Sequence, residues 1–530
     1  MATMAMGTAN KKLSVICLAI LTSLHTAHAG EWDFTPSLTL EENYTDNVEL
    51  VDAGETESLV SQLGIDFSLD YLAQGAEFTF NSSSIYATYS HDHDLDDGFL
   101  ELDTNGRFAL WPNGIALVFS ATVENQARNG ARNALADIVS GDTVQTERYS
   151  GGFEYQIDNS DFQFFANATY NLNQADDDIG EQEGFSSQIL TKNGNASRNV
   201  FWDFNANYLE RTNNDQDSKR HIAELKLGWI TNYKINPFIR AYNEDNTGNV
   251  GNNNSYESNS YGVGLRWLVT PRFYLDVSYN KPEDEQQNID GEEQEEYVNA
   301  EVNWQPTSRT TLNASYGQRF YGESYSLDLT HRNKRLTNSI RYSEEVQVFT
   351  RDNYEYLPQG AFWCPIDFIE SSECYVEPGD NFNFDDYNLV TFNDFEIIED
   401  NEFSLNKRVA WTSELKLPRT TFSFDLNFND RESLETRISD RNSGANFKID
   451  RRVSGYSTVD LKLTYTEKLF DYQTENERTD RYRQYAINYK RDLNAKFNFN
   501  VTLAHVNRDS SQETFNYKES RVTLKFIKDF

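Results

Sequence analysis

The chain is short of long apolar runs, basic residues and prolines, and each shortage excludes a class of protein. Beyond the first 30 residues, no stretch offers the ~20 consecutive apolar residues of a transmembrane helix, so a helical membrane bundle is excluded. Lys and Arg total 47 against 84 Asp and Glu, a formal net charge of −37. A nucleic-acid-binding protein needs a basic surface and is excluded as well. Only 10 prolines, with 14% aromatic residues, argue against an intrinsically disordered chain.

Cysteine is also scarce. Cys17 lies in an apolar segment that we expect to be removed, which leaves Cys364 and Cys374. In the oxidising compartment of an exported protein, two such cysteines favour a disulfide. A two-cysteine metal site is the alternative, but no histidine lies nearby. We therefore predict no bound metal and no cofactor.

Residues 1–29 have the pattern of a secretory signal peptide. Lys11 and Lys12 precede a short apolar stretch, and Ala27-His28-Ala29 offers a cleavage site before Gly30. Removal of the two lysines makes the mature chain still more acidic. We expect residues 30–530 to form a single domain.

Along the mature chain, apolar and polar residues alternate with period two, which indicates strands with two different faces. Clear examples run from Val200 to Tyr208 and from Tyr261 to Val269. Short turns alternate with long polar connectors, the layout of an outer-membrane barrel with short periplasmic turns and long external loops. The short turns include Ala73-Gln74-Gly75, Asn236-Pro237 and Arg451-Arg452, and the long connectors include 91–98, 174–184, 211–219, 243–257 and 281–296.

The sequence therefore predicts an all-β fold, a transmembrane antiparallel β-barrel of about 24 strands, with 22 to 26 as the range. It has short periplasmic turns and long acidic extracellular loops. A water-soluble array of β-sandwiches is the alternative. The distribution of tryptophan disfavours it, because most tryptophans fall close to a predicted short turn, where an aromatic girdle meets the headgroups. These are Trp32, Trp111, Trp202, Trp229, Trp267 and Trp304.

The polar face of the alternating strands would line the lumen. Its candidate members are Asp203, Asn205, Asn207, Arg266, Asp276, Asn299, Glu301, Asp425 and Asn427. The last strand alternates apolar residues through Phe526 and ends on Phe530, similar to the C-terminal targeting pattern of bacterial outer-membrane barrels. Lys528 interrupts that pattern. A one-residue slip in register would exchange the two faces.

The longest connector, about 350–403, holds fourteen acidic residues, one arginine and many aromatic residues. We expect it to fold into the lumen or to cap the mouth, with a Cys364–Cys374 bridge at its tip. A surface loop with a local disulfide is the alternative.

Residue types for catalysis are present, but no site is evident. His91-Asp92-His93-Asp94 could hold a divalent metal, yet a solvated external loop explains the same residues. A G-x-S-x-G nucleophile signature is absent. We predict a protein that is not an enzyme.

The mature N-terminus begins with Trp32-Asp33-Phe34-Thr35-Pro36-Ser37-Leu38-Thr39-Leu40 and continues into Glu42-Asn43-Tyr44-Thr45-Asp46-Asn47-Val48. This P-S-L-x-L strand with its Y-T-D-N-V turn resembles the outer-membrane barrel proteins of PEP-CTERM/exosortase exopolysaccharide systems, within the type 2 β-barrel porins. The residues that carry the resemblance are Trp32, Pro36, Tyr44, Thr45, Asp46 and Asn47. They span about 17 residues, and the general layout covers the rest more loosely. Without the resemblance, Thr45-Asp46-Asn47 is simply a favourable turn.

The resemblance implies an outer-membrane partner of an exopolysaccharide or surface-protein export system in a Gram-negative bacterium. The expected partners are outer-membrane lipid and lipopolysaccharide, the barrel assembly machinery, exopolysaccharide and periplasmic export components, with no nucleic acid. A closed scaffold that binds surface proteins is a second hypothesis. A general cation-preferring diffusion porin, suggested by the net charge, is a third.

Overall fold

The computed structural model describes residues 30–111, 114–213, 216–231, 233–249, 255–283, 286–348, 353–366, 374–375, 387–398, 402–472, 474 and 477–530. The predicted signal peptide, residues 1–29, lies outside the described residues, as does much of the long acidic connector.

The described residues form strands almost throughout. In the first half these are β1 (Glu31–Thr45), β2 (Ser58–Ala73), β3 (Ala76–Tyr89), β4 (Asp97–Ala109), β5 (Ile115–Ala127), β6 (Thr143–Asp158), β7 (Phe162–Ala175), β8 (Gln182–Asn193), β9 (Val200–Asn213), β10 (Gln216–Trp229), β11 (Ile235–Gly248), β12 (Tyr256–Glu257) and β13 (Ser260–Thr270). In the second half they are β14 (Phe273–Pro282), β15 (Tyr297–Thr307), β16 (Thr310–Arg319), β17 (Gly322–Arg332), β18 (Leu336–Gln347), β19 (Asn353–Pro365), β20 (Tyr387–Ile398), β21 (Ser404–Lys416), β22 (Thr420–Ser433), β23 (Ser439–Ser454), β24 (Ser457–Tyr472), β25 (Arg478–Asn494), β26 (Phe497–Ser510) and β27 (Tyr517–Asp529). Two short 3₁₀ helices, η2 (His93–Leu95) and η5 (Glu513–Phe515), complete the elements.

The main sheet closes on itself, because the first strand pairs antiparallel with the last, from Ser37↔Asp529 to Thr45↔Arg521. It has 25 strands, of which the two-residue β12 pairs only with β11. The other 24 form the wall of the barrel, and β19 and β20 form a separate two-stranded sheet. The prediction of a closed antiparallel β-barrel of about 24 strands is confirmed. In the part of the chain that the structure describes, no helix is long and apolar enough to cross a membrane.

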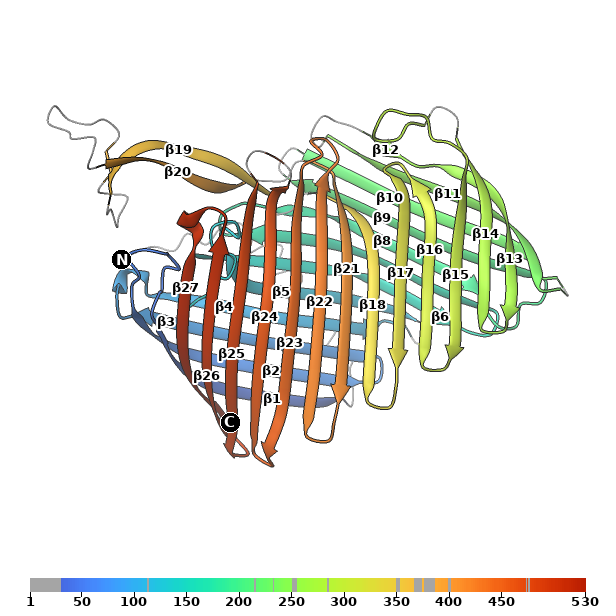
Figure 1. The fold of residues 1–530 in the computed structure, drawn as a ribbon. Helices are drawn as coiled ribbons and strands as arrows, with labels where there is room; N and C mark the ends of the chain where they lie inside the picture. The colour runs from blue at the N-terminus through green and yellow to red at the C-terminus, as the bar shows by residue number, and fades with distance from the viewer. Residues whose placement is uncertain are drawn as a thin grey trace.

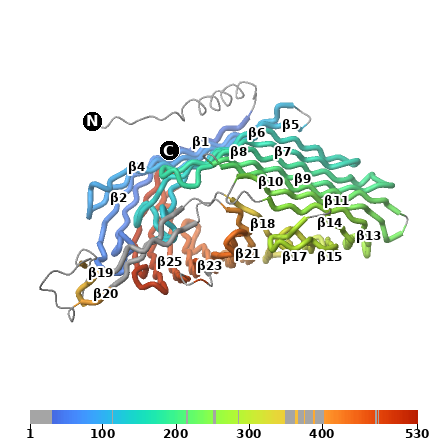
Figure 2. The backbone as a smooth tube through the Cα atoms, turned by 90° about the horizontal axis from the view of Figure 1, so that it is seen from above, coloured from blue at the N-terminus to red at the C-terminus, as the bar shows by residue number. Residues whose placement is uncertain are grey.

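The barrel is flattened. In Figure 1 the strands of the front wall, β18 to β27, run at a steep angle across those of the back wall, β1 to β9. Strands on opposite walls of a barrel are each tilted by about 35–45° in opposite senses, so such a crossing is expected. Seen from above, the cross-section is elongated and narrows on the side of β10 to β15 (Figure 2).

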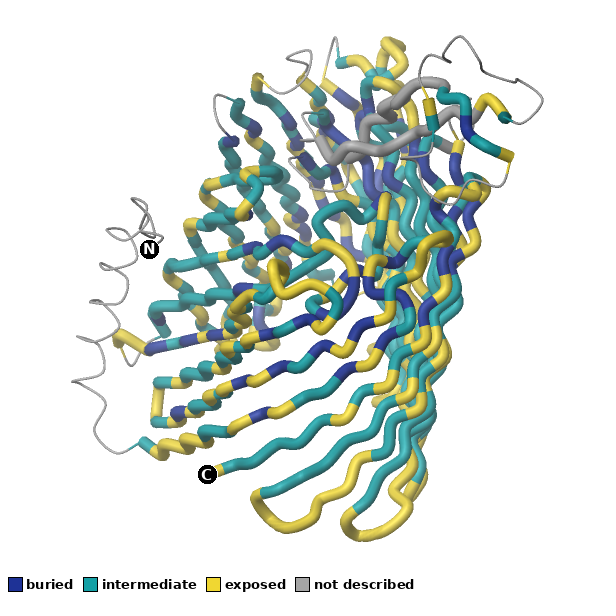
Figure 3. The backbone as a smooth tube through the Cα atoms, turned by 90° about the vertical axis from the view of Figure 1, so that its left-hand side faces the viewer, coloured by how far each residue is buried: buried dark blue, intermediate teal, exposed yellow. Residues whose placement is uncertain are grey.

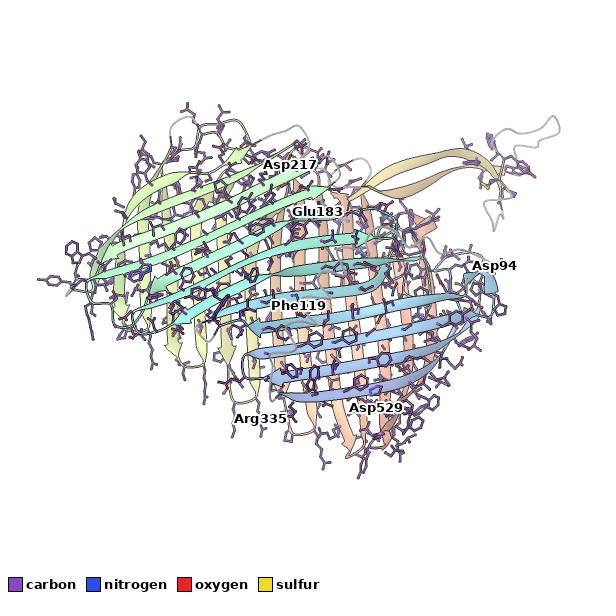
Figure 4. All side chains as sticks on the ribbon, turned by 180° about the vertical axis from the view of Figure 1, so that it is seen from behind. Asp94, Phe119, Glu183, Asp217, Arg335 and Asp529 are labelled. Atoms are coloured by element: carbon purple, nitrogen blue, oxygen red, sulfur yellow. A yellow bond between two sulfur atoms is a disulfide. The ribbon has the colours of Figure 1, made fainter. Side chains whose placement is uncertain are left out.

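The two faces of the wall differ as the period-two pattern requires. On β13, Tyr261, Val263, Leu265 and Trp267 are all exposed on the outer face. Trp32, Trp111 and Trp229 are likewise exposed near the short turns. Figure 4 shows Asp94, Glu183 and Asp217 toward the loop end of the barrel, and Arg335 and Asp529 toward the turn end.

Several strands extend further than the sequence pattern indicated. β9 runs to Asn213 and β10 starts at Gln216, so most of the predicted connector 211–219 is strand. Asn236-Pro237 lies within β11 and Arg451-Arg452 within β23, so these two predicted turns are also wrong. The reason is that polar residues can continue a hydrogen-bonded ladder beyond the apolar zone, where no lipid contact imposes alternation.

Burial is concentrated at the loop end. In Figure 3 the dark blue buried segments lie mainly toward that end, whereas the short turns are exposed. The apolar clusters agree: one contains Phe320, Val346 and Phe403, and another contains Val48, Val60 and Val139. The packed core is therefore built from loops together with the strand ends next to them.

Candidate functional site in the barrel lumen

Four of the predicted lumen residues lie close together on the inner wall of the narrow half. Arg266 donates two hydrogen bonds to Asp276 on the neighbouring strand, of 2.8 and 2.7 Å. Lys226 forms an ion pair with Glu301 and lies opposite Asp203 in the β9–β10 register. Charges of both signs therefore meet on this wall.

The ion pair between Lys226 and Glu301 joins strands that are not neighbours. Four strand steps, or roughly 19 Å at ~4.8 Å per step, separate β10 from β15 along the wall. Lys226 can reach Glu301 only because the two walls approach each other. The side chains of this half therefore bridge the lumen.

Further contacts of the same kind close the narrow half. Arg319 of β16 donates to Glu244 of β11 at 2.7 Å, and the side chain of Glu244 is fully buried. Arg220 of β10 donates to the carbonyl oxygen of Val346 on β18 at 2.7 Å. Above them, the backbone N–H of Ile289 donates to the carbonyl oxygen of Phe320, which closes the loop end.

The remaining predicted wall residues are spread around the barrel. Asn207 donates to Asn205 on β9, and Asn299 lies opposite Ser278 in the β14–β15 register. Asp425 and Asn427 lie across the barrel on β22. Asn446 of the neighbouring strand β23 donates to Asp425 at 3.4 Å. The structure does not bring these two groups together.

The wide half of the lumen holds a feature that the sequence analysis missed. The segment 128–142, between β5 and β6, folds inward and packs against the inner wall of β25 to β27 and β1 to β3. We call it the crossing loop. Its Ala131 carbonyl oxygen accepts hydrogen bonds from Arg478 at 2.6 Å and from Arg508 at 2.9 Å. Arg508 also donates to the carbonyl oxygen of Arg132.

The two arginines that hold the crossing loop are completely buried. Both pair with Asp480, at 3.1 Å from Arg478 and 2.7 Å from Arg508, and all three side chains are 0% exposed. The rings of Phe470 and Phe515 lie over Arg478. Buried charges persist only when paired and hydrogen-bonded, so the loop carbonyls are part of this cluster.

A second anchor lies at the other end of the crossing loop. Arg521 of β27 donates to Asp137 at 2.7 Å, and Ser140 donates to Glu519 at 2.8 Å. The hydroxyl of Tyr89 donates to the carbonyl oxygen of Ile138. The loop is therefore attached to the wall on both sides of the β1–β27 seam.

The local sequence of the crossing loop suits this path. The Asn129 side chain accepts from the backbone N–H groups of Ala131 and Arg132, and Asp137 caps Val139 and Ser140 in the same way. Such side-chain turns are typical of Asn and Asp. Its small and branched apolar residues, among them Ala131, Ala136 and Val139, are buried. An alanine-rich connector among acidic ones was the signal that could have revealed it.

A polar cavity of about 530 Å³ lies beneath the crossing loop. Its roof contains Asp137, Ile138 and Val139, and its walls are formed by β1 to β5 and β27. A second cavity of about 370 Å³ is lined by Glu77, Thr79, Asn105 and Arg107, among others, nearer the turn end of β3 and β4. The two cavities follow one stretch of wall from the loop end toward the turn end.

The residues of the N-terminal motif lie at the seam of the barrel. Thr45 donates to Glu519 at 2.8 Å, and the Asp46 side chain accepts from the backbone N–H of Ser520. Asn47 donates to the carbonyl oxygens of Val51 and Lys518 and is fully buried. This part of the motif therefore closes the barrel.

Trp32 and Tyr44 of the motif are both exposed and lie at opposite ends of β1. Trp32 packs on Tyr71 with ring centroids 4.2 Å apart, and Tyr44, at the loop end, donates to Glu57 at 3.0 Å. Pro36 accepts a hydrogen bond through its carbonyl oxygen from the backbone N–H of Phe530. Phe526 packs against Phe497 and Phe499 of β26. The two chain ends thus support each other.

The long acidic connector does not enter the lumen where the structure describes it. Its strands β19 and β20 pair only with each other and lie above the wall at the loop end (Figure 1). A disulfide joins Cys364 to Cys374. The two described strands lie above the barrel wall, and the expectation that the connector enters the lumen or caps the mouth stays a prediction. The crossing loop lies inside the barrel, where its small apolar residues are buried.

The His/Asp segment forms a capped turn at the rim. His91 contacts the hydroxyl of Ser58 at 2.8 Å, and His93 lies 3.3 Å from Asp96. The backbone N–H of Tyr89 and the hydroxyl of Thr88 donate to Asp96, which lowers the pKa of that carboxyl. Across the described ranges, no group of three or more His, Cys, Asp or Glu side chains is arranged to hold a metal ion.

Comparison with known proteins supports no closer assignment than the fold. No protein-family model and no curated protein matches the chain. The siderophore receptor PirA from Pseudomonas aeruginosa is 10% identical over 94% of this chain and 80% of that chain, with a TM-score of 0.38. OccK2 (OpdF) from Pseudomonas aeruginosa is 8% identical over 94% and 98%, with a TM-score of 0.34. A loop-deletion mutant of OmpT, an outer membrane protein of Vibrio cholerae, is 8% identical over 95% of this chain and 100% of that chain, with a TM-score of 0.31. The fold of the chain, a closed antiparallel β-barrel, follows from its own strand pairing.

Proposed function

We propose that this protein is a non-enzymatic channel of the Gram-negative outer membrane that passes hydrophilic, carbohydrate-like solutes along one side of its lumen. The observation that carries the proposal is the pair of polar cavities along β1 to β6, beneath the crossing loop. The narrow half is bridged by the ion pairs Lys226–Glu301 and Arg319–Glu244.

The biological cargo that we propose is exopolysaccharide, in line with the resemblance of the N-terminal motif. Hydroxyl, amide and carboxylate groups line the upper cavity, and these are suitable partners for sugar hydroxyls. We further propose that the barrel is exported by its signal peptide, inserted by the barrel assembly machinery and surrounded by lipopolysaccharide. Periplasmic export components would supply the cargo.

Single-channel recording of the refolded mature protein in a planar bilayer tests the channel. Stable conductance is expected, and its absence would contradict the proposal. Deletion of the gene tests the cargo: surface polysaccharide should fall, and an unchanged amount would remove exopolysaccharide from the proposal.

A second candidate is a diffusion porin that prefers cations. It is favoured by the net charge of −37 and by acidic residues at the loop end, such as Asp94 and Asp217. Reversal potentials in a salt gradient separate the two. Strong cation selectivity without any effect of added oligosaccharide would favour this porin.

A further inference from the structure

Gln62 is a buried amide that faces the upper cavity. The residue is only 7% exposed, and it lines the cavity. A primary amide offers two donors and two acceptor lone pairs. The amide nitrogen and oxygen open onto the cavity, so they can meet a polar group of a molecule that enters it.

The groups next to Gln62 are already occupied. Glu41, directly opposite on β1, accepts from Asn43 at 3.0 Å and pairs with Lys525 at 3.0 Å. The second cation of the cavity, Arg521, is paired with Asp137. Both positive charges that line the cavity are therefore neutralised.

Two further carboxylates line the cavity without a cationic partner. Asp66 accepts hydrogen bonds from the hydroxyls of Thr39 and Ser83. Ser83 of β3 lies opposite Asp66 in one strand register and opposite Glu101 of β4 in the next. Glu101 is exposed and has no hydrogen-bond or ion-pair partner in the described part of the chain. A carboxylate only accepts hydrogen bonds. The cavity therefore favours ligands rich in hydroxyl or ammonium donors and disfavours anions.

The shape and the apolar residues of the cavity fit a short sugar chain. Gln62 and Asp66 are four residues apart on β2, which separates them by roughly 13 Å along the strand. Ile85 of the wall and Ile138 of the crossing loop add apolar surface for the C–H faces of sugar rings. About 530 Å³ lies within the usual range for small-ligand sites, about 300–1,000 Å³.

We propose that the cavity beneath the crossing loop is a binding site for a neutral or cationic oligosaccharide, with Gln62 and Glu101 as its recognition groups. The inference rests on the proposed channel function and names the class of solute that the channel binds. With the second cavity nearer the turn end, this site would be the last station on an export path from the periplasm.

Block of single-channel current by defined oligosaccharides tests the site. The probes are maltohexaose as the neutral sugar, fully deacetylated chitohexaose as the cationic sugar and hexagalacturonate as the anionic sugar. Maltohexaose and chitohexaose should block the unmodified channel, and hexagalacturonate should not. Gln62→Leu should weaken the block by maltohexaose about tenfold, as expected for one or two lost hydrogen bonds. Glu101→Gln should weaken the block by chitohexaose more than the block by maltohexaose.

Glu414→Gln is the matched control, because it removes one carboxylate from β21, outside the cavity. It should leave both blocks unchanged, and heat-modified mobility should show that every variant folds. Block unaffected by Gln62→Leu, or equal block by hexagalacturonate, would overturn the site. If no current flows, calorimetric titration of the detergent-solubilised protein with maltohexaose tests the binding site independently of the channel. Binding that Gln62→Leu weakens would support the site while the channel function fails, and absence of binding would overturn both.

Discussion

Arg521 of β27 and Asp137 of the crossing loop are joined by two hydrogen bonds, of 2.7 and 3.2 Å, although they lie 384 positions apart in the chain. Arg521 also contacts Glu519, which accepts hydrogen bonds from Thr45 of β1 and Ser140 of the loop. One charged cluster therefore holds together the seam of the barrel and the constriction of its lumen.

Loosening this anchor should change the current through the barrel. Asp137→Asn keeps the side-chain turn to Val139 and Ser140 but removes the charge that pairs with Arg521. We expect a larger and noisier single-channel conductance, because the roof of the cavity becomes mobile. Asp142→Asn, whose carboxylate is exposed and pairs with Arg128, is the control and should leave the conductance unchanged. Equal traces for both variants would show that the anchor does not control the opening.

Excision experiments should distinguish the two long connectors. Replacing residues 130–140 by a short Gly/Ser linker removes the crossing loop and should raise the conductance several-fold. Replacing residues 351–401 in the same way removes the hairpin β19–β20 and should have little effect, since that hairpin lies above the wall and pairs with no strand of the barrel. The opposite ranking in planar bilayers would assign the constriction to the acidic hairpin.

The buried cluster of Arg478, Arg508 and Asp480 should be critical for stability. Asp480→Asn leaves two guanidinium groups without the carboxylate that they share, and we expect a loss of about 3–5 kcal/mol in the free energy of unfolding. Tryptophan fluorescence during urea unfolding in lipid vesicles measures it. Asp509→Asn is a matched control, because Asp509 is exposed and lies 3.9 Å from Arg483. A loss as small as that of the control would mean that the pairs contribute nothing net.

The seam depends on Asn47. Its side chain donates to Val51 and Lys518 and accepts from the backbone N–H of Val51. Asn47→Ala should lower the free energy of unfolding by about 1–3 kcal/mol, since buried backbone groups lose their partners. Asn105→Ala, at an exposed position, should cost much less. Similar urea midpoints for both variants would contradict a structural role for the motif.

The lipid-facing side of β13 can be tested directly. Leu265→Arg places a charge on the outer face of a strand centre and should cost about 2–4 kcal/mol in a bilayer. Asn207→Arg places the same charge on the lumen side of β9 and should fold nearly as well as the unmodified chain. Equal destabilisation would mean that the two faces are assigned to the wrong sides.

The sequence was sufficient for the type of fold. Period-two alternation along strands such as Tyr261 to Val269 is imposed by lipid on one face and water on the other, and each strand carries this signal by itself. Strand ends were less predictable. At 211–219 the residues are polar, and composition does not reveal whether a polar segment continues the ladder or leaves it.

The sequence by itself determined which residues face lipid, because that choice is local and repeats every second residue. Only the tertiary structure decided how the lumen is filled. Lys226 pairs with Glu301 from a strand four steps away along the wall. Arg508 donates to the carbonyl oxygen of Ala131, which is hundreds of residues away in the chain. Such contacts depend on the curvature of the closed wall, which no local pattern encodes. For the same reason the position of the alanine-rich crossing loop inside the barrel could not be predicted from the sequence.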